Sequence, residues 1–309
     1  MAWRTVMIQN PARLSLSNGQ LRLQNDEGQF TLPVEDITAL VLESPQISLT
    51  SSLLAECQDR GVAILTCDRT HTPNGVLLPF LPHSRQSRIA HIQQSWTEPL
   101  KKRLWQRIVQ CKILNQAACL DMAVGDTESS RLKALASRIG SGDPDNGEAQ
   151  AAREYWPRLF GADFRRHGDD SINAALNYVY AVVRAFVARS QVAYGLIPAF
   201  GLHHDNELNA FNLTDDVMEV FRPLVDHLVF SLWQGNEISF GESSLPLQVR
   251  QKLAGAGTMN CRIGGQVHTL ANACDLMAAG LVTAIEGKSA ALLPVPEFPV
   301  SAGKVTAPA

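Results

Sequence analysis

Residues 171–194 read SINAALNYVYAVVRAFVARSQVAY, and this stretch decides what the second half of the chain is. It is the longest run in which apolar side chains recur at helical spacing, and Gly195 follows where a helix would end. The pattern predicts the longest helix of the chain and a mainly helical second half.

Helical spacing continues on both sides of this stretch. Upstream, the loop SGDPDNG at residues 141–147 separates two helical segments, and the second starts at or near Glu148. The other expected helices start near Pro99, cover residues 132–139, and run from about Thr214 to Trp233. After Leu292 the chain is rich in Pro, Ala and Val, which predicts a flexible tail over residues 289–309.

The first part of the chain reads as β-rich. Asn18-Gly19 and Glu27-Gly28 are hairpin-like turns between short alternating runs, and Gly61 ends a helical segment at residues 51–60. The expected strands cover residues 4–8, 13–16, 20–23, 30–32, 37–42 and 62–66. We therefore predict an α+β chain: a small β-rich N-terminal domain over residues 1–80, which we expect to dimerise, a linker over 81–99, and a larger all-helical domain over 100–288.

Bulk composition excludes several classes of protein. The 309 residues are 45% hydrophobic and 18% charged, and no apolar run is long enough to span a bilayer. The N-terminus lacks a secretory signal, and the six cysteines include no C-x-x-C pair, so we expect a cytoplasmic chain without a zinc ribbon or a disulfide framework. The formal charge of −3 means that any contact with nucleic acid needs a localised basic face or a partner.

The strongest local signal for chemistry joins GLHH at residues 201–204 with TDDVMEVFRP at residues 214–223. Asp216 and Glu219 are three residues apart, so on a helix they share a face that a histidine from the preceding loop can reach. Histidine and carboxylates with open positions for water or phosphate oxygens suit Mg²⁺ or Mn²⁺. Such an ion polarises a phosphate and activates an attacking water or hydroxyl.

Ordinary interpretations of the same residues stay open at this point. Asp215 and Asp216 fall in the first turn of the expected helix, where negative charge suits the helix dipole, and adjacent histidines in a loop are usually solvated. Glu148 at the start of its helix fits a capped surface helix equally well. Arg85 and Arg88 belong to the densest basic stretch, which solvated charge on a linker also explains.

Three segments taken together resemble the CRISPR-associated integrase, the catalytic subunit of spacer acquisition, in the form found beside type II effector nucleases. They are EAQAAREYW at 148–156, GLHH at 201–204 and DVMEVFRP at 216–223, and FRR at 164–166, DSIN at 170–173, LNYVY at 176–180, Trp3-Arg4 and LES at 42–44 add to the likeness. The resemblance extends from about residue 1 to 288. Val220 stands where many relatives have proline, and Ala149 where a glycine often follows the glutamate; neither is a ligand position.

Residue by residue, the resemblance implies that Glu148, His204 and Glu219 are the catalytic metal ligands, with Mg²⁺ or Mn²⁺ as cofactor. Asp216 matches an acidic position of the site that can support a ligand side chain instead of binding the ion itself. The resemblance also places Arg165 and Arg166 near the catalytic helix, as contacts to DNA phosphates that position the duplex without reading its sequence. Arg85 and Arg88 are further candidates for contact with nucleic acid.

The resemblance implies a homodimer that works with a small ferredoxin-like CRISPR-associated partner protein. Its substrates would be double-stranded DNA with 3′-hydroxyl ends and CRISPR repeat DNA, joined by attack of each 3′-hydroxyl on a phosphodiester. A stand-alone metal-dependent nuclease acting on branched DNA is the alternative, because its metal site would look the same. A non-catalytic DNA-binding scaffold is a third possibility.

Overall fold

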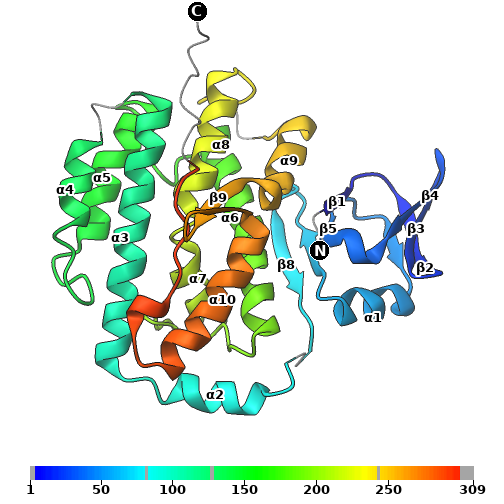
Figure 1. Ribbon diagram of the computed structural model, residues 1–309. Coiled ribbons are helices and arrows are strands. Elements are labelled where there is room, and N and C mark those ends of the chain that lie inside the picture. Colours follow the sequence, from blue (N-terminus) through cyan, green and yellow to red (C-terminus); the bar gives the residue numbers. More distant parts are fainter. Residues whose placement is uncertain (1–3, 81–82, 126–128, 242–243, 300–309) are drawn as a thin grey trace, which may run out of the picture.

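A computed structural model describes residues 4–80, 83–125, 129–241 and 244–299. Strands dominate the N-terminal part and helices the remainder, which confirms the predicted α+β class (Figure 1). The N-terminal strands lie at one end of the molecule and the helices form its larger body (Figure 1).

Two four-stranded sheets build the N-terminal part. The first has the order β1-β5-β7-β8, in which β1 (Arg4–Ile8), β5 (Ile37–Leu42) and β7 (Ala63–Cys67) are parallel and β8 (Pro73–Leu77) is antiparallel. The second has the order β4 (Gly28–Pro33), β3 (Gln20–Asn25), β2 (Ala12–Ser17) and β6 (Ile47–Leu49). The N-terminal part also contains the short helices η1 (Val34–Asp36) and α1 (Ser51–Asp59). Every predicted strand is present, and β6 and β8 are additional.

The first sheet connects two hydrophobic cores. Ala39, Val41 and Leu65 pack into the helical core, whereas Leu40 and Ile64 point to the opposite face and join the core of the N-terminal strands. A strand that is buried on both faces has no polar alternation, and β5 is accordingly apolar at nearly every position. Because this sheet belongs to both cores, the N-terminal part cannot shift relative to the helices without disturbing packing.

The helical part surrounds α6 (Ser171–Ala193), which contacts α7 (Asn212–Met218), α8 (Arg222–Gln234), α9 (Leu247–Ala254) and α10 (Leu270–Glu286). The helices α3 (Glu98–Ala123), α4 (Ser130–Ala136) and α5 (Gly147–Phe160) form a second group that packs on α8 through α3 (Figure 1). Among the described helices, α6 alone has the length and apolar composition of a membrane span. Its most apolar window is 78% buried, as in the core helix of a globular fold.

The predicted linker over residues 81–99 is wrong for most of its length. Gln86–Gln94 forms helix α2, whose Ile89 is buried in the helical core. The buried Gln93 side chain accepts a hydrogen bond from the Ile197 backbone N–H and donates to the Ile197 and Phe200 carbonyls. Residues 81–82 lie outside the described part of the chain. Residues 86–94 are therefore a packed helix of the core, although the prolines around them suggested a hinge.

The helix predicted from Thr214 to Trp233 is two helices, α7 and α8, with a break at residues 219–221. Pro223 explains the break, because it has no N–H to donate to the carbonyl of Glu219. The break places Glu219 at a bend rather than inside a straight helix. Its position matters for the site described below.

Two further differences concern the C-terminal region. A hairpin of β9 (Asn260–Ile263) and β10 (Gln266–Thr269), preceded by η2 (Gly255–Thr258), interrupts the part predicted as all-helical. The flexible tail predicted from residue 289 is wrong for residues 289–299, where η3 (Ala290–Leu292) forms and Leu293 and Phe298 are buried. The Pro296 carbonyl accepts a hydrogen bond from Asn115 on α3, which fixes this segment. Residues 300–309 lie outside the described part.

Candidate active site

Glu148 is held at the first turn of α5 by the loop that precedes it. Asp143 accepts hydrogen bonds from the backbone N–H groups of Gly147 (2.7 Å) and Glu148 (3.0 Å). A Cβ at Gly147 would lie 2.2 Å from Ile139 Cδ1, so a larger residue there would require the Ile139 side chain to move. The Glu148 carboxylate crosses to α3, where its Oε1 accepts a hydrogen bond from Lys112 Nζ at 2.6 Å. Glu148 therefore faces another helix, which a simple capped surface helix does not require.

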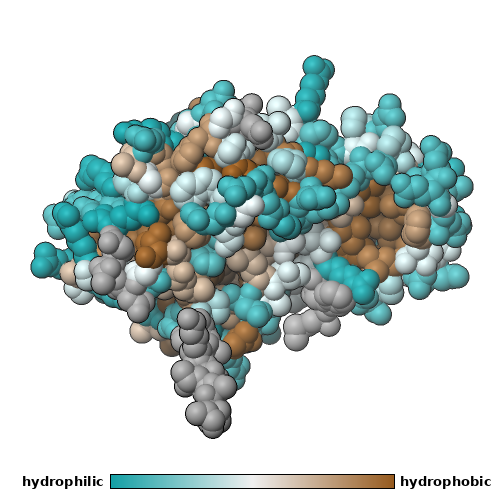
Figure 2. All heavy atoms as spheres, turned by 90° about the horizontal axis from the view of Figure 1, so that it is seen from above, coloured by the Kyte–Doolittle hydropathy of each residue, from teal (hydrophilic) through white to brown (hydrophobic). Residues whose placement is uncertain are grey.

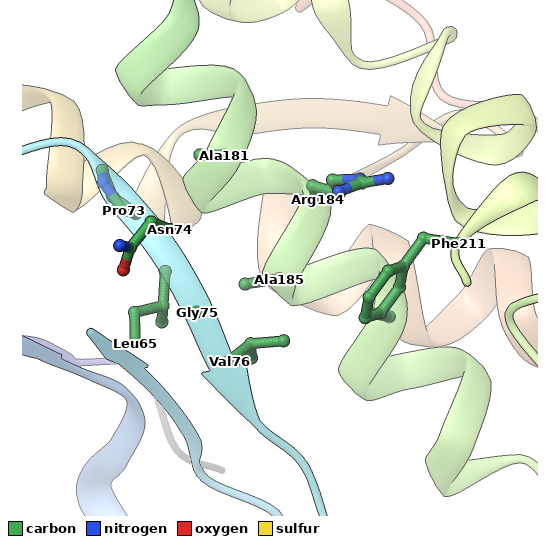
Figure 3. A pocket seen from close by; sticks show the side chains of 10 residues that line it. Leu65, Pro73, Asn74, Gly75, Val76, Ala181, Arg184, Ala185 and Phe211 are labelled. Atoms are coloured by element: carbon green, nitrogen blue, oxygen red, sulfur yellow. The ribbon is translucent and has the colours of Figure 1, made fainter. Parts of the chain in front are cut away.

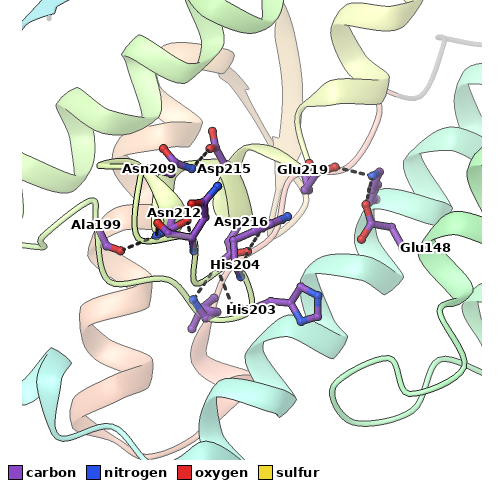
Figure 4. Close-up of polar contacts among 12 residues, drawn as sticks. Glu148, Ala199, His203, His204, Asn209, Asn212, Asp215, Asp216 and Glu219 are labelled. Carbon is purple, nitrogen blue, oxygen red and sulfur yellow. Dashed lines mark hydrogen bonds and ion pairs between the residues drawn. The ribbon is translucent and has the colours of Figure 1, made fainter. Parts of the chain in front are cut away.

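Glu219 comes from the break between α7 and α8 and points toward Glu148 (Figure 4). Its side chain is 7% exposed, its Oε1 lies 2.9 Å from Arg222 Nε, and its Oε2 lies 2.5 Å from Lys112 Nζ. Burial alone would raise the pKa of Glu219, but Arg222 and Lys112 outweigh it and the net pKa is lowered. Glu219 is a buried, ionised carboxylate.

His204 lies in a loop whose backbone is held by hydrogen bonds to Asp216. The Asp216 carboxylate, fully buried on α7, accepts hydrogen bonds from the backbone N–H groups of Leu202 (2.6 Å), His203 (3.0 Å) and His204 (3.2 Å). It also lies 2.6 Å from His204 Nδ1 (Figure 4). Gly201 permits the tight turn, since a Cβ there would lie 2.1 Å from the His204 carbonyl oxygen. The predicted meeting of a loop histidine with this helix face is present.

Asp216 also determines which nitrogen of His204 is free. With Nδ1 donating to Asp216, the lone pair of the imidazole is on Nε2. The pKa of His204 is raised by the hydrogen bond to Asp216, against the effect of burial, and the charges of Glu219 and Glu148 add to the rise. His203 has a different role in the loop: its ring stacks on Trp105 with centroids 4.4 Å apart.

The donor atoms at this site are of the kinds that a divalent cation binds. Glu219 Oε2 is buried without a hydrogen bond of good geometry, a second carboxylate faces it, and His204 can offer Nε2. Among the described residues no three His, Cys, Asp or Glu side chains lie close enough to hold an ion as they stand. The Lys112 ammonium lies between the two carboxylates instead. Carboxylate oxygens are the ligands that Mg²⁺ and Mn²⁺ prefer, and binding of either ion here stays a prediction.

A pocket of about 370 Å³ opens beside His204 and Glu219 and has a cationic wall. The Arg166 and Arg222 guanidiniums stack on Tyr180, with 5.4 and 4.5 Å from Cζ to the ring centroid, and Arg184 completes the wall. Asn173 and Asn177 accept hydrogen bonds from Arg166. The pocket thus places fixed positive charge next to the carboxylates, as binding of a phosphate requires.

Sequence reasoning missed Lys112, Tyr180 and Arg222 as members of this site. Lys112 follows directly after Cys111 on the apolar side of α3. A lysine on the buried side of a helix is unusual, and this position could have been recognised from the sequence as a candidate for a paired, functional charge. Tyr180 lay in LNYVY and Arg222 in EVFRP, which carried the family resemblance but gave neither residue a role.

The other predicted nucleic-acid contacts are spread over the surface. Arg165 donates to the backbone carbonyls of Ala162 and Phe164 and does not line the pocket, unlike its neighbour Arg166. Arg88 on α2 pairs with Glu286 of α10 at 2.8 Å, and Arg85 precedes α2. Neither Arg85 nor Arg88 borders the pocket, and their contact with DNA stays a prediction.

A separate cavity of about 240 Å³ lies between β8 and α6. Figure 3 shows Leu65, Val76 and Phe211 around it, with Arg184 at one side. Arg184 is its one charged lining residue, and it is already paired with Asp215. This cavity lacks the acids and bases that phosphodiester chemistry needs, so the site beside His204 remains the candidate.

Comparison with known proteins agrees with the fold and with the family resemblance. A family model described as CRISPR associated protein Cas1 matches residues 6–245. The CRISPR-associated endonuclease Cas1 of Neisseria meningitidis serogroup C is 41% identical over 298 residues, which are 96% of this chain and 97% of the relative. A Cas1 endonuclease of Pyrobaculum aerophilum is 26% identical over 79% of this chain and 87% of its own.

Solved structures share the fold at low sequence identity. A Cas1 protein from Thermotoga maritima superposes with a TM-score of 0.69 at 17% identity, over 92% of this chain and 97% of its own. A casposase bound to its integration product gives a TM-score of 0.75 at 17% identity, over 93% of this chain and 91% of its own.

Proposed function

The chain belongs to the Cas1 family of CRISPR-associated proteins, and from this we propose that it is a divalent-metal-dependent DNA integrase that inserts short duplexes into CRISPR repeat DNA. Each 3′-hydroxyl end of the incoming duplex attacks a phosphodiester of the repeat. The exchange forms one phosphodiester and breaks another, and the displaced strand leaves with a 3′-hydroxyl. No nucleotide hydrolysis is needed.

One observation supports this proposal: Lys112 pairs with both Glu148 and Glu219, and Glu219 lines a cationic pocket together with His204. Glu148 and Glu219 would hold the ion through carboxylate oxygens and His204 through Nε2. When bound, the ion supplies polarisation of the scissile phosphate and activation of the attacking hydroxyl. Asp216 touches the histidine and its loop rather than the gap between the glutamates, so we assign it the positioning of His204.

In this proposal Arg166 and Arg222, which line the pocket, bind the DNA phosphate. Arg222 is oriented by Glu219 on one side and by the Tyr180 ring on the other, and Arg166 by Asn173, Asn177 and the same ring. Guanidiniums whose rotamers are fixed in this way offset the charge that develops on the phosphate without reorganising during the reaction. They also compensate locally for the net charge of −3.

A stand-alone nuclease acting on branched DNA uses the same ligands with water as the nucleophile, and a scaffold would bind DNA without reacting. One reaction separates these functions from the integrase. The protein is mixed with a small CRISPR-associated partner, a labelled duplex and a repeat-bearing plasmid in Mg²⁺ or Mn²⁺. We expect labelled plasmid; cut plasmid without label would favour the nuclease, and retention alone the scaffold.

Arg166→Ala will weaken DNA binding more than Arg165→Ala does. Arg166 faces the pocket, whereas the Arg165 guanidinium is engaged with its own backbone. Each phosphate contact on duplex DNA contributes about −0.9 to the slope of log K against log salt. A fluorescence-anisotropy titration from low to moderate salt should therefore show a shallower slope for Arg166→Ala. Equal slopes for the two variants would mean that Arg166 does not touch the phosphate backbone.

We also propose that the chain is a homodimer that uses an apolar face of its N-terminal strands. Cross-strand pairing places Leu14 and Leu23 on one face with Phe30, and this face is buried at Leu14 but open at Phe30, which is 53% exposed. Figure 2 shows apolar side chains gathered at the end of the molecule that holds these strands, with hydrophilic ones around them. A self-complementary contact there would bury what the chain alone leaves exposed.

Phe30→Asp will shift this dimer toward monomer. It removes apolar contact worth about 1.5–3 kcal/mol at full burial and adds a charge, which corresponds to a weakening of about tenfold or more. Light scattering over a concentration series measures the shift. Thr31→Asp adds the same charge on the opposite, exposed face of β4 and serves as the control. An unchanged dimer in Phe30→Asp would place the interface elsewhere.

The remaining parts of the proposal follow the family resemblance. They are a cytoplasmic location, a small ferredoxin-like partner protein, and DNA substrates with free 3′-hydroxyl ends. The joining reaction above tests the partner and the substrates together, because omission of either should remove the labelled plasmid.

A further inference from the structure

Lys112 on α3 is a buried cation at the centre of the site. Its side chain is 10% exposed, and its Nζ lies 2.6 Å from Glu148 Oε1 and 2.5 Å from Glu219 Oε2. Glu148 belongs to α5 and Glu219 to the break between α7 and α8, so a single ammonium links three parts of the helical body. Lysine is almost never buried to this degree unless it is paired.

The two carboxylates need a cation between them. Two negative charges that both reach one ammonium repel each other, and burial of Glu219 removes the water that would screen that repulsion. Arg222 offsets part of the charge of Glu219 from the opposite side, but the Glu148 carboxylate has Lys112 as its ion-pair partner. Without either Lys112 or a metal ion, Glu148 and Glu219 would be forced apart.

We propose that Lys112 is a built-in counterion that keeps Glu148 and Glu219 together in the metal-free protein and that a divalent cation displaces. This rests on the proposed function, in which the same two carboxylates hold Mg²⁺ or Mn²⁺. The ammonium and the ion compete for the same oxygens, since each carboxylate oxygen engaged by Lys112 is one that a hard cation prefers. The lysine therefore preserves the geometry of the ligands at the expense of metal affinity.

Competition between Lys112 and the ion predicts the direction in which removal of Lys112 changes the affinity for metal. By linkage, if the ion weakens the pairing of Lys112, then Lys112 weakens binding of the ion by the same factor, typically about 5- to 150-fold. Lys112→Met removes the ammonium and keeps an unbranched apolar chain that fits a buried position. We expect calorimetric titration with Mn²⁺ to give a Kd at least about fivefold lower for Lys112→Met than for the unsubstituted protein.

The matched control is Lys133→Met, which removes the same charge from an exposed pair with Asp121. Its Kd for Mn²⁺ should equal that of the unsubstituted protein. An unchanged Kd in Lys112→Met would overturn the competition. So would a higher Kd, which would mean that Lys112 helps the ligands to bind the ion.

The counterion role is tested without metal. In chelator, Lys112→Met should lower the midpoint of thermal unfolding, because it leaves two facing carboxylates without their shared cation. Glu148→Gln in the same chain removes one of those charges and should restore most of the loss, a positive coupling in the double-mutant cycle. A loss of equal size in the single and double variants would mean that the lysine acts by packing alone, and the counterion role would be overturned.

The two experiments separate failure of this inference from failure of the proposed function. If neither the unsubstituted protein nor Lys112→Met binds Mn²⁺, both the metal site and the competition are overturned, while the chelator experiment still decides the counterion role. If Glu148→Ala abolishes Mn²⁺ binding but Lys112→Met leaves it unchanged, the metal site stands and the competition does not.

Discussion

Replacing Glu148, His204 or Glu219 will lower strand joining by about 10³-fold while the protein stays folded. In the proposed mechanism each residue would supply one donor to the same ion, and polarisation of the phosphate by such an ion contributes several kcal/mol to the reaction. At about 1.4 kcal/mol per tenfold, loss of most of that contribution gives a reduction of this order. The measurement is transfer of a labelled duplex to a repeat-bearing plasmid in Mn²⁺, with circular dichroism to confirm the fold.

The choice of substitution matters because the three positions differ in burial. Glu148→Ala and His204→Ala remove partly exposed side chains. Glu219→Ala would leave Lys112 and Arg222 buried without their carboxylate, so Glu219→Gln is the better variant there. Full joining activity by any one of these variants would remove that residue from the ligand set.

The neighbouring histidine provides the control. His203→Phe keeps an aromatic ring for the stack on Trp105 and removes both ring nitrogens. We expect this variant to retain most of the joining activity, because His203 packs the loop and His204 has the oriented Nε2. A loss equal to that of His204→Ala would mean that the wrong histidine was chosen.

The elements of the fold were predictable where local pattern and tertiary packing agree. The hairpin turn at Asn18 and Gly19 has the positive φ angles, 51° and 72°, that its sequence predicts. The helix at residues 171–194 was readable because its apolar side chains recur at the period of the helix. Both features depend on residues that are close in the sequence, which is the information that a pattern contains.

The misplaced elements depend on contacts between distant residues. Nothing near Gln93 indicates that it will hold the backbone of Ile197, and nothing near Pro296 indicates that Asn115 will bind its carbonyl. The break after α7 is the exception, since Pro223 carried the signal and the apolar pattern was followed instead. A proline that removes a hydrogen bond to Glu219 should have outweighed a continuous apolar face.

The same contrast between local pattern and distant contacts applies to the candidate site. Spacing alone placed a histidine near the helix face that contains Asp216, and the structure has that contact, whereas Glu219 follows the end of α7 instead of lying on the same helix. Spacing could not place Glu148, which precedes Glu219 by 71 residues. The two glutamates are connected only through Lys112 of α3, which forms an ion pair with each of them. The family resemblance supplied Glu148, but not Lys112, because a ligand set carried over from relatives contains only the residues whose roles were already assigned.

The identity of the nucleophile separates an integrase from a nuclease that has the same ligands. If a DNA 3′-hydroxyl attacks, a donor duplex with 3′-deoxy ends will bind with unchanged affinity and give no joined product, a loss limited only by the detection of the assay. The reason is stoichiometric: the oxygen that forms the new phosphodiester is absent from the donor. Anisotropy on the same duplex measures binding, so that a failure to join is not mistaken for a failure to bind.

The same substrate also tests whether the ion is needed for the chemical step. With 3′-hydroxyl donors, Mg²⁺ or Mn²⁺ should support joining and a chelator should stop it, because Glu148, Glu219 and His204 offer oxygen and nitrogen donors that suit these ions. With 3′-deoxy donors, weak nicking of the target can persist, since an ion also lowers the pKa of a bound water. Nicking at the repeat with both donors, and joining with neither, would identify the chain as a nuclease. Joining that survives both the chelator and the blocked ends would overturn the mechanism and leave the fold and family alone standing.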